Sequence, residues 1–250
     1  MKKLLISIMG VAIMCATPSV ASAQFVDHSP AKKFVETDIH VLGGSTMITQ
    51  NYASRFDEIS ELNSSAGFGF GAGAGAVFGL REWLGLGTEI NLLVSNNKLD
   101  MAVGSEGSVS VSNIFISNRY AYADIPVYMS FRFNILGGLR WNVDAGLYYR
   151  YGIWGKQKQT IYNSTLNNLG QLVPRVVNAK VDYFRDNATF INSFHRSDIG
   201  LHIATGLQFG RHFTISMRLQ AGFKNVAYNN GLRNPNIHNL SFLCGVGYKL

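Results

Sequence analysis

The feature that most constrains the fold is an alternation of apolar and polar residues, which residues 213–224 show without a break. The odd positions are apolar: Phe213, Ile215, Met217, Leu219, Ala221 and Phe223. The even positions are Thr214, Ser216, Arg218, Gln220, Gly222 and Lys224. Successive side chains of a β-strand point to opposite faces, so this period of two predicts a strand with one apolar and one polar face.

The same alternation recurs along the chain and predicts eight strands. They cover residues 34–47, 66–80, 84–95, 124–134, 139–153, 198–210, 213–224 and 239–250. The connections near 81, 136 and 211 are short, whereas those at 48–65, 96–120, 155–197 and 225–238 are long. Because closure leaves no unpaired edge, this pattern predicts an all-β, eight-stranded antiparallel up-and-down barrel.

The N-terminal residues 1–23 have the pattern of a signal peptide. Lys2 and Lys3 precede an apolar core at 4–16, and Ala21-Ser22-Ala23 forms a small-residue cleavage site. Residues 24–33 would then be a short N-terminal segment and 34–250 the barrel domain. Removing Lys2 and Lys3 takes the 22 basic residues to 20 against 15 acidic ones, so the formal charge falls from +7 to +5.

Composition limits the class of protein further. Only 15% of the residues are charged, against about 25% in an average soluble domain. After the signal, however, no stretch reaches the roughly 18 apolar residues of a membrane helix, which excludes a helical membrane protein. An exported chain has no expected nucleic-acid partner. Of the two cysteines, Cys15 leaves with the signal, so no internal disulfide is expected.

Three features orient the apolar face of the barrel outward, toward lipid. An eight-stranded barrel has room inside only for close-packed side chains, and the polar face of 66–80 is a row of glycines from Gly67 to Gly75. Aromatic residues of the apolar face gather beside the short turns, as at a bilayer interface; they are Phe78, Phe131, Phe133, Trp141, Phe209, Phe213 and Tyr248.

The third feature is that the polar face carries charges of both signs, which can pair across a narrow lumen. These residues are Asp38, Glu89, Asp124, Asp144, Arg132, Arg140, Arg150, Arg218 and Lys224. In particular, we expect arginines to pair with Asp124 and Asp144. The sequence therefore predicts a transmembrane barrel in contact with outer-membrane lipid, with an ion-paired lumen and no continuous water channel.

Several motifs carry a resemblance to a known family. Tyr122-Ala123-Asp124-Ile125-Pro126-Val127, Asp198-Ile199-Gly200-Leu201 and the end at Tyr248-Lys249-Leu250 are similar to outer-membrane β-barrel proteins of the Bacteroidetes type, the porin-family or PorT-like group. More loosely, the chain resembles the transmembrane domain of OmpA. The resemblance implies an outer-membrane location and insertion by the barrel-insertion machinery, but no single activity. The group usually ends in Phe, and Leu250 departs from that signal.

The sequence offers few candidates for chemistry. Ser193, His195, Arg196 and Asp198 lie together near the predicted outer rim, where a hydrolase or acyltransferase would place its site. Such a group is commonplace at a loop-strand junction, and we predict no catalytic residue, cofactor or metal site. His202 is expected in the lumen network, Cys244 on the lipid face as an inert apolar residue, and Pro126 at a bulge or bend.

The long outer connections are the best candidates for a specific function. Residues 155–197 are rich in Asn, Gln and aromatic residues, and we expect this loop to bind a surface ligand, a glycan or a neighbouring envelope protein. The prediction is a non-enzymatic protein with a structural or loop-mediated binding role. The alternatives are a soluble lipocalin-like carrier, a PorT-like component of a secretion apparatus and an enzyme with its site at the rim.

Overall fold

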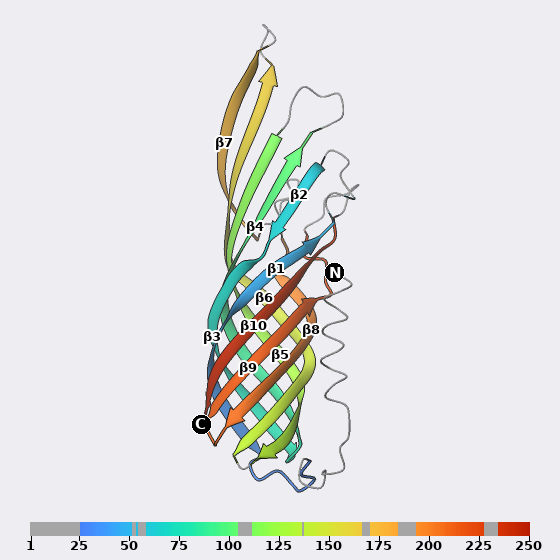
Figure 1. The fold of residues 1–250 in the computed structure, drawn as a ribbon, viewed down its shortest axis with the longest axis vertical. Helices are drawn as coiled ribbons and strands as arrows, with labels where there is room; N and C mark the ends of the chain where they lie inside the picture. The colour runs from blue at the N-terminus through green and yellow to red at the C-terminus, as the bar shows by residue number, and fades with distance from the viewer. Residues whose placement is uncertain are drawn as a thin grey trace.

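The structure is a computed structural model that describes residues 26–51, 54, 59–104, 112–136, 138–166, 171–184, 194–227 and 235–250. Its strands form one antiparallel sheet (Figure 1). They are β1 (Val35–Gln50), β2 (Ile59–Ser65), β3 (Gly67–Arg81), β4 (Leu84–Val103), β5 (Ser112–Leu136), β6 (Leu139–Leu166), β7 (Leu172–Asp182), β8 (Ser197–Phe209), β9 (Phe213–Gly222) and β10 (Ile237–Lys249). Among these described residues, no helix is long and apolar enough to cross a membrane.

Eight of the strands close a ring, which confirms the predicted eight-stranded up-and-down barrel. Their order is β4-β3-β1-β10-β9-β8-β6-β5, and β5 pairs back onto β4. The first and last strands, β1 and β10, are joined from Asp38 opposite Lys249 to Gln50 opposite Ile237. The connections β3–β4, β5–β6 and β8–β9 lie together at what we call the short-turn end, where Gly138 and Gly210 have φ of 90° and 61°. Other residues rarely adopt these values.

Three strands continue far past the ring at the opposite end, which we call the long-loop end. The strands β4, β5 and β6 have 20, 25 and 28 residues, whereas about 9–11 residues suffice to cross a membrane. The outer half of β6 pairs with β7, and β2 pairs with β4 beyond the end of β3. Together they form a sheet that rises above the barrel (Figure 1), which we call the extension. The prediction of loops at 96–120 and 155–197 was therefore wrong for much of their length.

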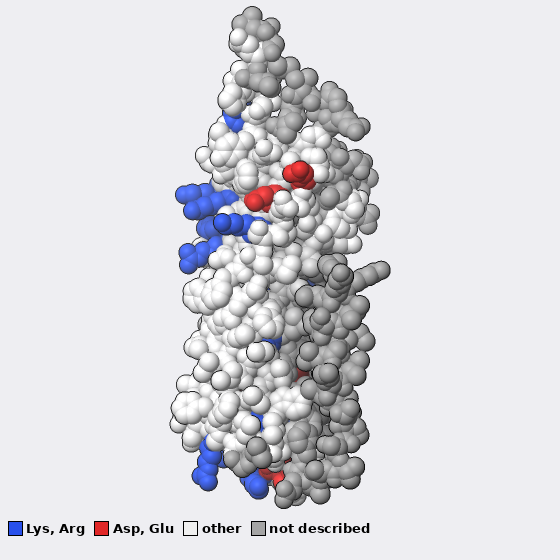
Figure 2. All heavy atoms as spheres, in the orientation of Figure 1, with Lys and Arg blue, Asp and Glu red and all other residues white. Residues whose placement is uncertain are grey.

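The apolar face points outward, as predicted. Val41, Ile90, Ile215 and Val246 are between 51% and 61% exposed, and the visible face of the barrel shows a broad band with few charged groups (Figure 2). A soluble lipocalin-like carrier would instead turn such a face inward around its ligand. The exposed apolar belt therefore excludes that alternative.

The lumen has two halves of different chemistry. Toward the short-turn end it is polar, and Glu89, Asp124, Arg150 and Arg218 are all buried. Toward the long-loop end an apolar core lies beside buried amides such as Asn97 and Gln157, so the buried charges are found mainly in the half near the short-turn end. This core contains Leu42, Ile48, Ile59, Leu93, Leu99, Met101, Ile116, Tyr120, Tyr122, Tyr183, Phe194, Val226, Ala227, Ile237 and Leu243.

Two further expectations concern Lys224, which is corrected, and Pro126, for which the bulge is not found. Lys224 is exposed beyond the end of β9, where it donates to Ser197 Oγ at 2.6 Å instead of facing the lumen. Pro126 lies opposite Tyr148 without a bulge, and the register shift of β5 falls between Ala121 and Tyr122. In the pairing of β5 with β4, the register is the same on both sides of Pro126. However, no residues pair in the gap between the pair Thr88–Val127 and the pair Asn91–Asp124. The missing N–H of proline interrupts the ladder there.

Candidate functional site

The middle of the lumen is held by a network around Glu89. Arg218 pairs with Glu89 Oε2 across the barrel, and Tyr128 donates its hydroxyl to Oε1 at 3.0 Å. Asn91 donates to Oε2 at 3.1 Å and bonds the His40 ring at 2.6 Å. A Cβ at Gly73 would lie only 2.1 Å from Asn91 Oδ1, so glycine leaves the space that this network fills.

A second layer is built around Arg150, one level closer to the long-loop end. Its Nε donates to Asp124 Oδ1 at 3.2 Å, and its Nη2 donates to Gln220 Oε1 at 2.8 Å. Gln220 in turn donates to Asp124 Oδ2 at 2.7 Å. The guanidinium also lies 4.1 Å from the centre of the Tyr122 ring, a cation-π contact. These groups are buried and bonded to one another across the lumen.

The predicted pairing of charges is confirmed for Asp124 but not for Asp144. Asp144 accepts a hydrogen bond from Asn142 at 3.0 Å, and no arginine lies within ion-pair distance of it among the described residues. Arg132 instead pairs with Glu36 at 3.1 Å, closer to the short-turn end. His202 is buried beside Gln220 at 3.3 Å, and it stacks on Tyr128 with the ring centres 5.4 Å apart.

Aromatic rings cap the lumen at the long-loop end. Tyr183, which follows β7, stacks between Tyr120 and Phe194 with ring centres 4.7 Å and 4.4 Å away. Phe184 packs edge-on against Tyr183 at 4.9 Å. The segment after β7 therefore returns to the barrel and covers its opening with buried rings.

Two residues of the rim group that suggested catalysis, Arg196 and Asp198, make hydrogen bonds within the fold. Ser193 lies outside the described residues. Arg196 donates to the carbonyl oxygens of Gly152 and Ile153 at 3.0 Å and 3.2 Å. Asp198 accepts from Tyr148 at 3.0 Å and from Asn239 at 2.8 Å. The cavity that His195 shares with Asp198 has a volume of only 20 Å³, which is room for about one water molecule.

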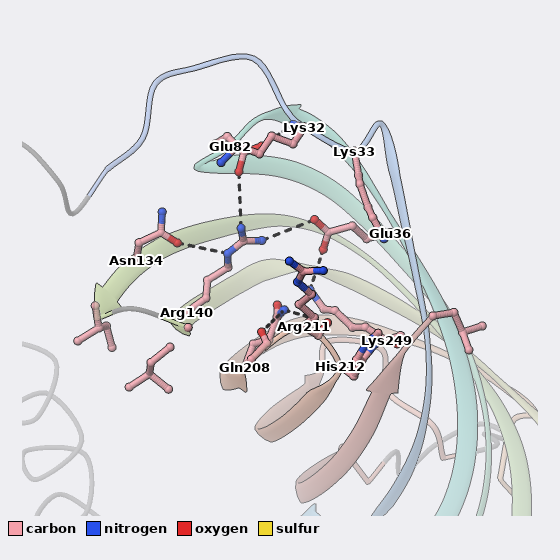
Figure 3. Close-up of a pocket in the computed structure, with 15 residues that line it drawn as sticks. Lys32, Lys33, Glu36, Glu82, Asn134, Arg140, Gln208, Arg211, His212 and Lys249 are labelled. Carbon is pink, nitrogen blue, oxygen red and sulfur yellow. Dashed lines mark hydrogen bonds and ion pairs between the residues drawn. The ribbon is translucent and has the colours of Figure 1, made fainter.

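A larger pocket of 790 Å³ opens at the short-turn end (Figure 3). Five cationic side chains line it, Lys32, Lys33, Arg140, Arg211 and Lys249, against two carboxylates. Figure 3 shows Arg140 between those carboxylates, with its Nη1 3.6 Å from Glu36 and its Nη2 3.5 Å from Glu82. Lys249 reaches Glu36 at 2.7 Å. We call this pocket the cationic mouth; its charge suits an acidic partner.

The segment 26–34 forms one wall of the cationic mouth. The Gly79 amide donates to the Phe34 carbonyl at 2.8 Å, and the Glu82 amide donates to the Ser29 carbonyl at 3.1 Å. Hydrogen bonds from Ser29 also hold the pKa of Asp27 below its ordinary value. These bonds fix the segment that carries Lys32 and Lys33 against the β3–β4 turn.

No described residues group as a metal site. Cys244 is exposed on the outward face of β10, between Phe242 and Val246, where the sequence placed it. What the sequence missed is the cationic mouth and the aromatic cap. The cationic mouth is assembled from three turns and both ends of the described chain. Only the clustering of Lys and Arg near the short turns could have indicated it from the sequence.

A comparison with protein families finds a match to the model described as "Outer membrane protein beta-barrel domain" over residues 31–228. Similar solved structures include Ail, the attachment invasion locus protein of Yersinia pestis, at 14% identity and a TM-score of 0.36, covering 87% of this chain and 100% of Ail. Neisserial surface protein A has 10% identity and a TM-score of 0.31, with 86% and 97% coverage. OprG from Pseudomonas aeruginosa has 8% identity and a TM-score of 0.32, with 90% and 97% coverage. No curated protein matches significantly.

Proposed function

Because the chain belongs to the outer membrane protein β-barrel family, which places it in the outer membrane, we propose that it is a non-conducting and non-enzymatic barrel that presents the extension for binding. The short-turn end, with its trimmed connections, would face the periplasm, and the extension would face the cell exterior. The binding partner would be a surface ligand, a glycan or another envelope protein. Outer-membrane lipid and the barrel-insertion machinery are the partners expected of any such barrel.

The observation that carries this proposal is that side chains fill the lumen, whereas the extension exposes side chains that could contact a partner. The lumen is occupied at three levels, by the Glu89 network, the Arg150 layer and the aromatic cap, so it offers no space to a substrate. The extension, by contrast, exposes apolar side chains above the membrane. Val173 and Val176 on β7 are 45% and 52% exposed, and Tyr162 on β6 is 47% exposed and packs on Phe115. Exposed apolar groups outside the lipid favour a protein or glycan contact.

The test removes the β6–β7 hairpin without touching the cap. A deletion of 160–192 would also remove the buried Tyr183, so the cut should stop at 178. Thr160 pairs with Asn178, and deleting 160–178 with an Asn-Gly insertion leaves a two-residue turn. We expect a barrel with heat-modifiable gel mobility that has lost its partner.

The partner is detected with a photo-crosslinking amino acid at Val176, and at Ile215 on the lipid face as the matched control. A specific cross-link to an envelope protein or glycan from Val176, absent from Ile215, supports the proposal. Equal cross-linking from both positions would contradict it. If the shortened protein fails to fold, the hairpin is structural and the proposal is wrong.

A second candidate is a PorT-like role in an envelope secretion apparatus, of the Bacteroidetes type that the strand motifs resemble. The cationic mouth supports it, because five cations around a pocket would face the periplasm and suit an acidic partner. Co-purification of envelope components that depends on Arg211 and Lys33 would favour this role. Loss of a measured activity in His195→Ala, with folding intact, would instead favour a rim enzyme.

A further inference from the structure

The outward face of the extension carries a second cluster of cations, on the side wall of the molecule. We call it the basic patch; it consists of Lys98, Arg119, Lys156, Lys158 and Lys180. All five side chains are exposed. Figure 2 shows Lys and Arg gathered on one side of the molecule, above the band with few charges.

The register places these cations in two rows directly above the lipid-facing surface. The last apolar row is Val94, Ala121 and Trp154 on β4, β5 and β6. The next outward row is Asn96, Arg119, Lys156 and Asp182, and the one after it is Lys98, Ser117, Lys158 and Lys180. The strands β5 and β6 therefore change from apolar to basic at the same level, and β4 becomes basic one row further, at Lys98.

The first row lies at the height of the headgroup region of a bilayer, and the second row lies just beyond that region, within reach of extended lysine side chains. Each row is two residues further along a strand, and strands rise about 3.3 Å per residue with a tilt near 40°. The rows then lie about 5 Å and 10 Å beyond the last apolar row, whereas headgroups occupy about 5–8 Å beyond the hydrocarbon on each side. A ligand at this level is reached sideways, from the membrane.

Among the described residues, one cation of the basic patch is ion-paired. Lys156 pairs with Asp182 at 2.6 Å, with both side chains more than half exposed. Within the described ranges, the other four cations have no carboxylate within ion-pair distance. The wall at β1 and β10 differs, because residues 47–50 and 237–240 contain no Lys or Arg. The basic patch therefore has no counterpart on the β1–β10 wall.

We propose that the basic patch binds the phosphate groups of lipids in the surrounding outer leaflet, and so gives the barrel a preferred phosphorylated lipid on its β4–β7 side. Several Lys and Arg side chains beside a bilayer attract anionic headgroups, and the guanidinium of Arg119 suits phosphate in particular. Continuity with the apolar row at Trp154 favours a lipid, because its acyl chains would lie on that row while its phosphate meets the cations. This inference depends on the membrane location and not on the binding role proposed for the extension.

The test uses Trp154 as a reporter. It is 45% exposed next to the basic patch, while the two other tryptophans, Trp83 and Trp141, lie at the short-turn end. Full-length W83F/W141F protein is placed in phosphatidylcholine nanodiscs with a small fraction of brominated phosphatidic acid, or the same fraction of brominated phosphatidylcholine. We expect about twofold stronger quenching by the phosphatidic acid, falling as salt is raised.

Two charge variants in this background decide the result. In K98Q/K158Q/K180Q the excess quenching should vanish, whereas R81Q/K224Q, which removes two exposed cations elsewhere, should keep it. Heat-modifiable gel mobility checks folding, and K158Q/K180Q replaces the triple variant if that one does not fold. Equal quenching by the two lipids, or an excess that survives the loss of the basic patch, overturns the proposal. Capture of heparin through these lysines without a lipid preference would also overturn it and assign the patch to a soluble polyanion.

Discussion

At the scale of single residues, stability should depend most on the Arg150 layer, because its charges are buried. Arg150→Ala leaves Asp124 without its cation in a site where both side chains are at most 5% exposed. Removing one partner of a buried pair costs about 3–5 kcal/mol. We expect a loss of this size in the free energy of unfolding, measured by urea denaturation in lipid vesicles.

The exposed pair of the extension provides the control for that measurement. Lys156 and Asp182 are 56% and 60% exposed, and a surface pair contributes less than about 1 kcal/mol. Lys156→Gln should therefore leave the unfolding curve nearly unchanged. The double variant D124N/R150M should lose less than Arg150→Ala, since it leaves no unpaired charge. Equal losses for buried and exposed variants would show that the lumen pair is not structural.

Some residues of the lumen could be assigned from sequence and others could not. Opposite charges on the polar face predicted that an arginine pairs with Asp124, because these residues alternate with apolar neighbours on their strands, but they did not identify the arginine as Arg150. Leu93 and Leu243, however, break the polar faces of β4 and β10 and are buried in the lumen. These two leucines were an indication of the apolar core that the strand patterns gave. A single apolar residue on a polar face, however, does not show which residues it will contact across the barrel.

At the scale of elements, the alternation predicted the strands that cross the membrane and missed the extension. Within the barrel one face meets lipid, so the contrast between faces is strong. In β6 beyond Gly155 both faces are polar: Lys156 and Lys158 point outward, while Gln157 and Gln159 are buried in amide hydrogen bonds. A strand with water on one face and hydrogen-bonded amide side chains on the other shows no alternation of apolar and polar residues. Its sequence therefore resembles that of a loop.

The orientation of β9 can be tested with neighbouring labels. Ile215 is 51% exposed on the outward face, and Ser216 is the next residue, on the lumen face. After Cys244→Ser, a spin label at 215 should be relaxed by oxygen dissolved in the lipid, and a label at 216 should not. Labels at Ile203 and Leu219 should behave like 215. The opposite pattern, with water-soluble reagents reaching 215, would mean that the apolar face points inward.

At the scale of the whole molecule, the three closed levels of the lumen predict electrical behaviour. An ion would have to displace the Arg218–Glu89 pair, the Arg150 layer and the stacked rings of Tyr120, Tyr183 and Phe194 in turn. Each level joins residues from more than one strand or segment, so no single side-chain rotation opens a path. An eight-stranded barrel also has an interior only wide enough for side chains.

We therefore expect the purified protein to show no stable single-channel steps in planar bilayers. Insertion is verified separately by flotation with liposomes and by heat-modifiable gel mobility. A lack of conductance then cannot result from a lack of inserted protein. The matched variant removes the cap with Tyr183→Ala and Phe194→Ala and should also stay silent, because the two charged layers beneath remain closed. Regular steps of large conductance from the wild-type protein would show that the lumen opens, and would make transport through the lumen the better account of this barrel.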